Sequence, residues 1–450
     1  MQFILYIKKE GINMKHGKKY LLPALLALGL SITGTNSQFI KECNTGVTKA
    51  AETDFVIDDN KILTAYNGTD TDIVIPDGIT GIGDRVFYNY TKLNSIIIPD
   101  SVITIGEKTF WNCKNLAEIT LPDNITEIGA GTFKNCRSLT KIIIPGNVKT
   151  IEQALFSDCR NLEEVVIPDG VTTIKPAAFS GCHSLTKARL PENLVTIEDS
   201  AFSGCKSLTK VSIPGNVKSI GHFVFSNCQN LKEINIPAKT EIIGDSAFSG
   251  CKNLISVIVK QSNKKYQSED GVLFKKIKNG LELMLYPANK KGAVYKIPGK
   301  TQKIDNGAFT ENKKLKELVL SGNMKNINYQ NSLFFGINNL KTLKINMKKG
   351  TKVNITFIID KDSSFGSLMP EAVQKNKNIA KITMPKEKEK NDDTIDYPLA
   401  YKLKGTIKAN KKGKTEIVFN RTTFQNKKTS DKEVKQQKIK LKTTLEITVK

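Results

Sequence analysis

Phenylalanine recurs between residues 87 and 248 at an unbroken spacing of 23 residues. An isoleucine stands five residues before each of these phenylalanines, and a leucine stands six residues after it. A fixed period of this length restricts the chain to a repeat architecture, in which each unit packs mainly on its neighbours. The eight members of the series are Phe87, Phe110, Phe133, Phe156, Phe179, Phe202, Phe225 and Phe248.

The repeating unit reads L-x-x-[IV]-x-[IL]-P-x-x-[IV]-x-x-I-x-x-x-x-F-x-x-C-x-x. Alternating apolar residues that end in proline predict a short strand, because proline lacks the N–H needed to extend a ladder. The second half, with the typical text IGxxAFxxC, predicts a turn followed by a brief helical or 3-10 segment. One coil of 23 residues suits a leucine-rich solenoid with short parallel strands.

A single unit of this kind cannot fold by itself. Five buried apolar side chains contribute roughly 7 to 15 kcal/mol, whereas ordering the 23 residues of a unit costs about 1 to 2 kcal/mol for each residue. Stacked coils share backbone hydrogen bonds at about 4.8 Å and a continuous core. We therefore expect one cooperative array.

Further copies of the repeat sequence indicate where the array ends. One more coil follows at residues 303–320, and Phe334, Leu340 and Ile345 form a degraded last one. Residues 271–286 predict two strands around Asn279-Gly280, and residues 55–76 have a similar layout. We assign the domains as a leader at 1–37, a linker at 38–53, a solenoid at 54–345 and a β-domain at 346–450. The solenoid includes an N-terminal cap and a hairpin insert at about 260–297.

The first residues have the features of a secretory signal. A basic segment at 14–19 precedes a short apolar core at 20–30, which is too short to span a bilayer. No later stretch approaches 18 apolar residues, so we expect no transmembrane helix once the leader is removed. These features predict a secreted protein, extracellular or held non-covalently on a bacterial cell surface.

The basic excess of the chain is concentrated near its end. The net charge is +24, and residues 346–450 hold 25 basic against 12 acidic residues. Export separates the protein from nucleic acid, and basic stretches such as residues 435–442 lack interleaved aromatic residues. We therefore expect no nucleic-acid partner, and we expect this region to bind anionic cell-wall polymer.

Seven of the eight cysteines lie three residues after a repeat phenylalanine and form a column, from Cys113 to Cys251. Neighbouring coils could bring two of them within disulfide range. Equivalent positions in a translational stack point the same way, however, and the set is odd in number. A buried thiol ladder is favoured over disulfides. Zinc is favoured less, because no C-x-x-C spacing occurs.

Catalytic and cofactor-binding motifs are not evident in the sequence. Only His183 and His222 remain after the leader, both at variable repeat positions, and no phosphate-binding G-x-x-x-x-G-K-[ST] occurs. We expect no enzyme activity, no cofactor and no metal.

Binding is the stronger expectation, and the strand half of the unit indicates where. Residues eight and ten after each phenylalanine should face outward on the concave side, flanking a buried residue at nine. Exposed aliphatic residues and a cluster of basic ones lie in these two columns. The predicted ligand-binding residues are Lys141, Ile143, Glu164, Val166, Lys187, Arg189, Lys210 and Ser212.

The unit I-G-x-x-A-F-x-x-C with its I-P strand end resembles the leucine-rich repeats of BspA-type bacterial surface proteins. The text SEDGVLF and LYPANK in residues 268–290 is similar to an insert common in that family. The resemblance implies a secreted or surface-displayed binding protein without enzyme activity. Its partners would be a protein or glycan of the extracellular matrix, a host cell or a neighbouring bacterium.

The C-terminal quarter is similar, more loosely, to a bacterial group 2 immunoglobulin-like domain. Alternating β-branched segments such as residues 353–359, 405–409 and 445–449 carry this likeness, and they predict a small all-β sandwich. The alternative to a binding function is a structural one, in which the array is a stalk or surface-layer component without a discrete ligand.

Overall fold

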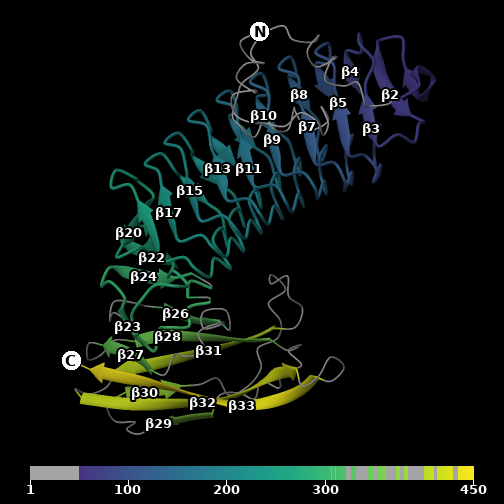
Figure 1. Ribbon diagram of the computed structural model, residues 1–450. Coiled ribbons are helices and arrows are strands. Elements are labelled where there is room, and N and C mark those ends of the chain that lie inside the picture. Colours follow the sequence, from purple (N-terminus) through teal and green to yellow (C-terminus); the bar gives the residue numbers. More distant parts are fainter. Residues whose placement is uncertain are drawn as a thin grey trace, which may run out of the picture.

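The computed structural model describes residues 50–305, 307–309 and 311–320 in full, and beyond these the backbone of eight strands between residues 326 and 449. The described coils stack side by side along a curved array, which runs from β2 (Ile62–Tyr66) to β24 (Thr301–Ile304) in Figure 1. The predicted leader lies outside the described residues, as does most of the predicted linker. No helix among the residues described is long and apolar enough to cross a membrane.

Each coil contributes one strand to a surface that we call the strand face. Its strands pair in parallel with a shift of 23 residues, so that Glu164 lies beside Lys141 and Lys187. Three sheets result, β3-β5-β7, β9-β11-β13 and β15-β17-β19. The strands are β3 (Asp72–Val74), β5 (Ser95–Ile97), β7 (Glu118–Thr120), β9 (Lys141–Ile143), β11 (Glu164–Val166), β13 (Lys187–Arg189), β15 (Lys210–Ser212), β17 (Glu233–Ile236) and β19 (Ser256–Val259).

A second, shorter strand in each coil ends at the isoleucine that stands five residues before the repeat phenylalanine. These two-residue strands also pair in parallel, in the orders β4-β6-β8 and β10-β12-β14-β16-β18, and the longer β2 (Ile62–Tyr66) pairs in parallel with β4. They are β4 (Gly81–Ile82), β6 (Thr104–Ile105), β8 (Glu127–Ile128), β10 (Thr150–Ile151), β12 (Thr173–Ile174), β14 (Thr196–Ile197), β16 (Ser219–Ile220) and β18 (Ile242–Ile243).

The repeat phenylalanines form a continuous column of rings in the core. Seven successive pairs stack with ring centroids 5.1–6.0 Å apart and planes within 11° of parallel. The repeat isoleucines and leucines are buried around them. Because backbone hydrogen bonds set the spacing of the coils, the same spacing separates the rings.

The return half of each coil is a series of turns, so the predicted helical or 3-10 segment there is wrong. Residues two before and two after the phenylalanine have positive φ, as at Ala177 (56°) and Gly181 (76°). The N–H groups at these positions and at the phenylalanine donate to carbonyls of the next coil, as Phe179 does to Ala201 at 2.8 Å. A helix would need those N–H groups for its own carbonyls. The one helix among the described residues is a 3-10 turn at Glu52–Asp54.

Both predicted hairpins are present. At the start, β1 (Phe55–Ile57) pairs antiparallel with β2 (Ile62–Tyr66), and β2 continues into the parallel ladder through β4. In the insert, β21 (Val272–Ile277) pairs antiparallel with β22 (Gly280–Leu285) around Asn279, whose φ is 69°. A third strand, β20 (Tyr266–Glu269), was not predicted, and it pairs antiparallel with β21.

Beyond the insert, β22 pairs in parallel with β24 (Thr301–Ile304), and β23 (Val294–Lys296) pairs with β25 (Glu317–Leu320). Two sheets follow, β23-β25-β27-β33-β32-β29 and β26-β28-β31-β30. The immunoglobulin-like assignment of residues 346–450 stays a prediction. The strands are β26 (Asn326–Gln330), β27 (Thr342–Met347), β28 (Lys352–Asp360), β29 (Glu371–Gln374), β30 (Ala380–Thr383), β31 (Ala400–Ala409), β32 (Gly413–Lys428) and β33 (Val434–Val449).

Candidate functional site

The strand face alternates as the repeat pattern predicts. The residue at position nine after each phenylalanine points into the core, as shown by Ile142, Val165 and Val211, which are 1–2% exposed. Its two neighbours point outward, which places the predicted binding residues in two parallel columns on one surface. Ala188 is the exception, because this small side chain is only half-buried between Lys187 and Arg189.

From β9 to β17, the first column is a row of charges whose sign alternates within each sheet, with two lysines, Lys187 and Lys210, where the sheets meet. Lys141, Glu164 and Lys187 occupy equivalent places on adjacent strands, and Lys210 and Glu233 repeat the alternation on the next sheet. The Lys and Glu side chains of this column are exposed, and none of them forms an ion pair within the described part of the chain. These charges are therefore solvated and available to a partner.

Within the sheet of β9, β11 and β13, the second column has two aliphatic residues followed by an arginine. Ile143 is 53% exposed, Val166 beside it is half-buried, and Arg189 follows in the same register. Ser212 is exposed on the first strand of the next sheet. An aliphatic strip that leads into cations is thus the distinctive chemistry of this face.

The basic residues lie where two of the strand-face sheets end. Lys187 and Arg189 are on β13, the last strand of one sheet, and Lys210 is on β15, the first strand of the next. The structure therefore brings Lys141, Ile143, Glu164 and Val166 into one hydrogen-bonded sheet with Lys187 and Arg189. Lys210 and Ser212 belong to the neighbouring sheet.

The two histidines show no catalytic arrangement. Partial burial, together with the charges of Lys206 and Arg160, lowers the pKa of His183. His222 accepts the backbone N–H of Asp245 on Nδ1 at 3.0 Å and lies 3.9 Å from the Asp245 carboxylate. Across the part of the chain that is described, no three or more His, Cys, Asp or Glu side chains gather to hold a metal.

The cysteine column consists of seven buried free thiols. Each Sγ donates to the carbonyl of the phenylalanine 26 residues earlier, at 3.0–3.3 Å. Burial raises the pKa of all seven, to about 12 at Cys113 and Cys251. The thiols thus act as small apolar groups with a weak donor, as the ladder interpretation predicts.

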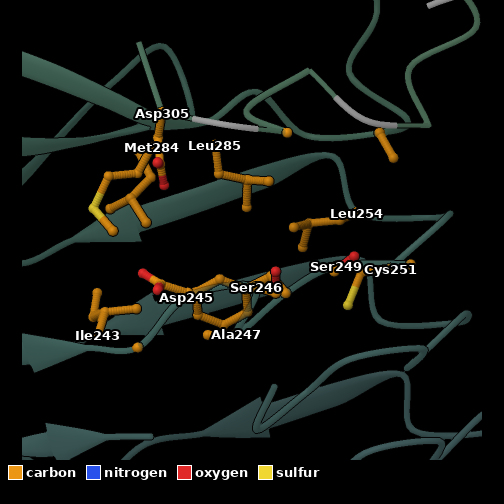
Figure 2. Close-up of a pocket in the computed structure, with 16 residues that line it drawn as sticks. Ile243, Asp245, Ser246, Ala247, Ser249, Cys251, Leu254, Met284, Leu285 and Asp305 are labelled. Atoms are coloured by element: carbon orange, nitrogen blue, oxygen red, sulfur yellow. The ribbon is translucent and has the colours of Figure 1, made fainter. Parts of the chain in front are cut away.

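A slot opens between the eighth coil and the hairpin insert, and it was not predicted. It has a volume of about 80 Å³ and is lined by residues 243–251 on one side and by Met284, Leu285 and Asp305 on the other (Figure 2). The signal in the sequence is the interrupted period, because 61 residues separate Phe248 from Phe309.

Coils built from two parallel strands and turns around a column of Leu, Ile and Phe define a leucine-rich repeat β-solenoid of about 11 turns. The family model described as BspA type leucine rich repeat region matches residues 65–186, 149–272 and 293–393, with six copies. The chain therefore belongs to the BspA-type leucine-rich repeat family. Proteins with such repeats are generally binding scaffolds without enzyme activity.

Three solved structures of leucine-rich repeat proteins illustrate the similarity. A leucine rich cell surface protein from Faecalibacterium prausnitzii is 27% identical, with 66% of this chain and 88% of that chain covered and a TM-score of 0.46. A leucine-rich repeat protein from Bacteroides ovatus is also 27% identical, covering 66% and 68%, with a TM-score of 0.47. The T. pallidum leucine rich repeat protein is 31% identical, covering 41% and 91%, with a TM-score of 0.37. No curated protein matches the chain.

Proposed function

We propose that the protein is exported to a bacterial cell surface or its surroundings and binds another macromolecule through the strand face. Family membership and the similarity to a protein described as a cell surface protein support the location. The partner is a protein or glycan of the extracellular matrix, of a host cell or of a neighbouring bacterium.

One observation carries the binding proposal. Ile143 exposes half of its surface on a strand whose fold requires only the neighbouring Ile142 to be apolar. Together with Val166 it makes an aliphatic strip that ends at Arg189 and Lys187. Aliphatic area bordered by arginine and lysine is suited to a partner with an apolar patch and an acidic rim.

Charge reversal at the basic cluster tests this proposal. We expect the triple change Lys187→Glu, Arg189→Glu and Lys210→Glu to reduce capture from matrix and envelope fractions at least tenfold. Ile143→Asp should do the same, because it would place a charge in the aliphatic strip. The measurement is a quantitative pull-down with the full chain.

A matched control is the same type of change on the opposite half of the coil. Lys134→Glu alters a half-buried lysine of the turn segments that packs on Trp111, and it should leave capture within twofold. Capture that survives both strand-face changes would contradict the proposal and favour the structural role without a discrete ligand.

We further propose that the basic C-terminal region retains the protein on anionic wall polymer. Its excess of 25 basic over 12 acidic residues supports this attachment. Full-length protein should bind purified cell walls in dilute buffer and be released by salt, since the Debye length shortens to about 3 Å at 1 M. Reversing Lys435, Lys438, Lys440 and Lys442 should weaken this binding at least fivefold, whereas the strand-face triple change should not. Retention that does not respond to salt would contradict the proposal.

A further inference from the structure

The backbone ladder that joins the turn segments is interrupted at one place. In each coil from Phe87 to Phe225, three N–H groups donate to carbonyls of the next coil. They belong to the phenylalanine, to the residue two positions before it and to the residue two positions after it. In the eighth coil the corresponding groups belong to Ser246, Phe248 and Gly250. These three N–H groups have no hydrogen-bond partner among the described residues.

The ladder resumes at the hairpin insert. Tyr286 lies 23 residues before Phe309, its ring centroid is 5.2 Å from that of Phe309, and its N–H donates to Ala308 at 2.6 Å. Tyr286 thus takes the place of a repeat phenylalanine. The opening is therefore confined to the space between the coil of Phe248 and the coil of Tyr286, which is the slot of Figure 2.

The core is slightly more exposed at this point than in the preceding coil. Phe248 is 5% exposed and Ile243 is 7% exposed, whereas Phe225 and Ile220 in the preceding coil are fully buried. The slot volume of about 80 Å³ is several times the roughly 10–15 Å³ that one water needs. The space is thus sufficient for a ligand group to approach the three N–H groups.

The three N–H groups lie on alternate residues of a turn segment, in which Ser246 and Gly250 have φ of 55° and 72°. In the preceding coils the carbonyl oxygens of the next turn segment accept from such a row of donors. A peptide can satisfy the open row with its own carbonyl oxygens, and its side chains then select the site. Leu254, Met284 and Leu285 supply an apolar wall, which is suited to an aliphatic side chain.

The charge around the slot is acidic. Asp245 and Asp305 lie on opposite walls (Figure 2), and the Asp245 side chain is 85% exposed. The pKa of Lys303 is raised by its hydrogen bond to Glu282, and the charges of Asp305 and Asp245 act in the same direction. A peptide that binds here is therefore expected to carry a basic side chain.

We propose that the slot binds a peptide segment of a partner protein, with its backbone carbonyls accepting from the N–H groups of Ser246, Phe248 and Gly250, an aliphatic side chain in the slot and a basic one at Asp245. This site is separate from the strand face and does not depend on the function proposed for it.

Residue-resolved hydrogen exchange on the full chain tests the open ladder directly. The amides of Ser246, Phe248 and Gly250 should exchange at least 100-fold faster than those of Phe223, Phe225 and Asn227, their equivalents in the preceding coil. Equal protection in the two coils would overturn the proposal, because it would mean that the slot is closed.

The probe peptide acetyl-Val-Lys-Val-Lys-Val-amide tests the ligand class. It should slow exchange of the three amides at least tenfold, and the Glu-for-Lys peptide should not. Asp245→Lys should weaken binding of the probe at least tenfold in a titration, whereas Asp169→Lys, an exposed aspartate remote from the slot, should change it less than twofold. Binding that ignores the sign of the peptide charge, or that leaves the three amides unprotected, would overturn the proposal.

Discussion

Replacing Phe156 by alanine should lower the free energy of unfolding by about 3–5 kcal/mol. The ring is fully buried and stacks between Phe133 at 5.5 Å and Phe179 at 5.4 Å. Its removal leaves a cavity and eliminates two ring contacts, because the backbone ladder holds the neighbouring coils apart. Urea unfolding followed by circular dichroism measures the loss.

Phe223→Ala is the matched control. This ring is 48% exposed, and the residue has a φ of 56°. Ala154 and Ala177 occupy the same repeat position with nearly the same φ, so alanine is compatible with the backbone there. We expect a change below about 1 kcal/mol. Equal losses for the two variants would mean that the phenylalanine column does not hold the array together.

The seven thiols of the cysteine column should react with a thiol reagent at least 1000-fold more slowly in the folded protein than in the unfolded one. The thiolate is the reactive form. With the pKa of Cys113 raised from 9.0 to about 12, its thiolate fraction at pH 8 falls from about a tenth to about one ten-thousandth. Burial slows the reaction further. In denatured protein without reductant, all of these thiols should react with the reagent. A count of reactive thiols near zero would contradict the ladder.

The same shift predicts a sensitivity to alkali. A folded pKa above the unfolded one means that stability from the neutral thiol is complete below pH 9 and is lost as the pH rises towards 12. The slope is at most about 1.4 kcal/mol per pH unit for each thiol. Cys113→Ser should therefore flatten the decline of unfolding free energy between pH 9 and 11. An unchanged slope would show that this thiol does not titrate on unfolding.

The regular part of the fold could be predicted because every coil repeats the same environment. The 23-residue spacing places the repeat phenylalanines and cysteines in columns, and alternation on the strands separates Ile142 from Ile143. The turn segments could not be predicted in the same way. The sequence of one coil considered alone is compatible with a helix. The turns form because the backbone hydrogen bonds run to the next coil, as from the N–H of Phe179 to the carbonyl of Ala201.

The sequence alone therefore determined the solenoid, its period, the thiol column and the candidate residues of the strand face, because translation along a stack turns sequence position into spatial position. Only the tertiary structure decided where that translation fails. The insert places Tyr286, which stacks on Phe309, at the next phenylalanine position of the array, and three backbone N–H groups of the coil of Phe248 are left without partners among the described residues. Local patterns carry no information about such a gap, since hydrogen bonds between coils depend on which backbone comes next in space.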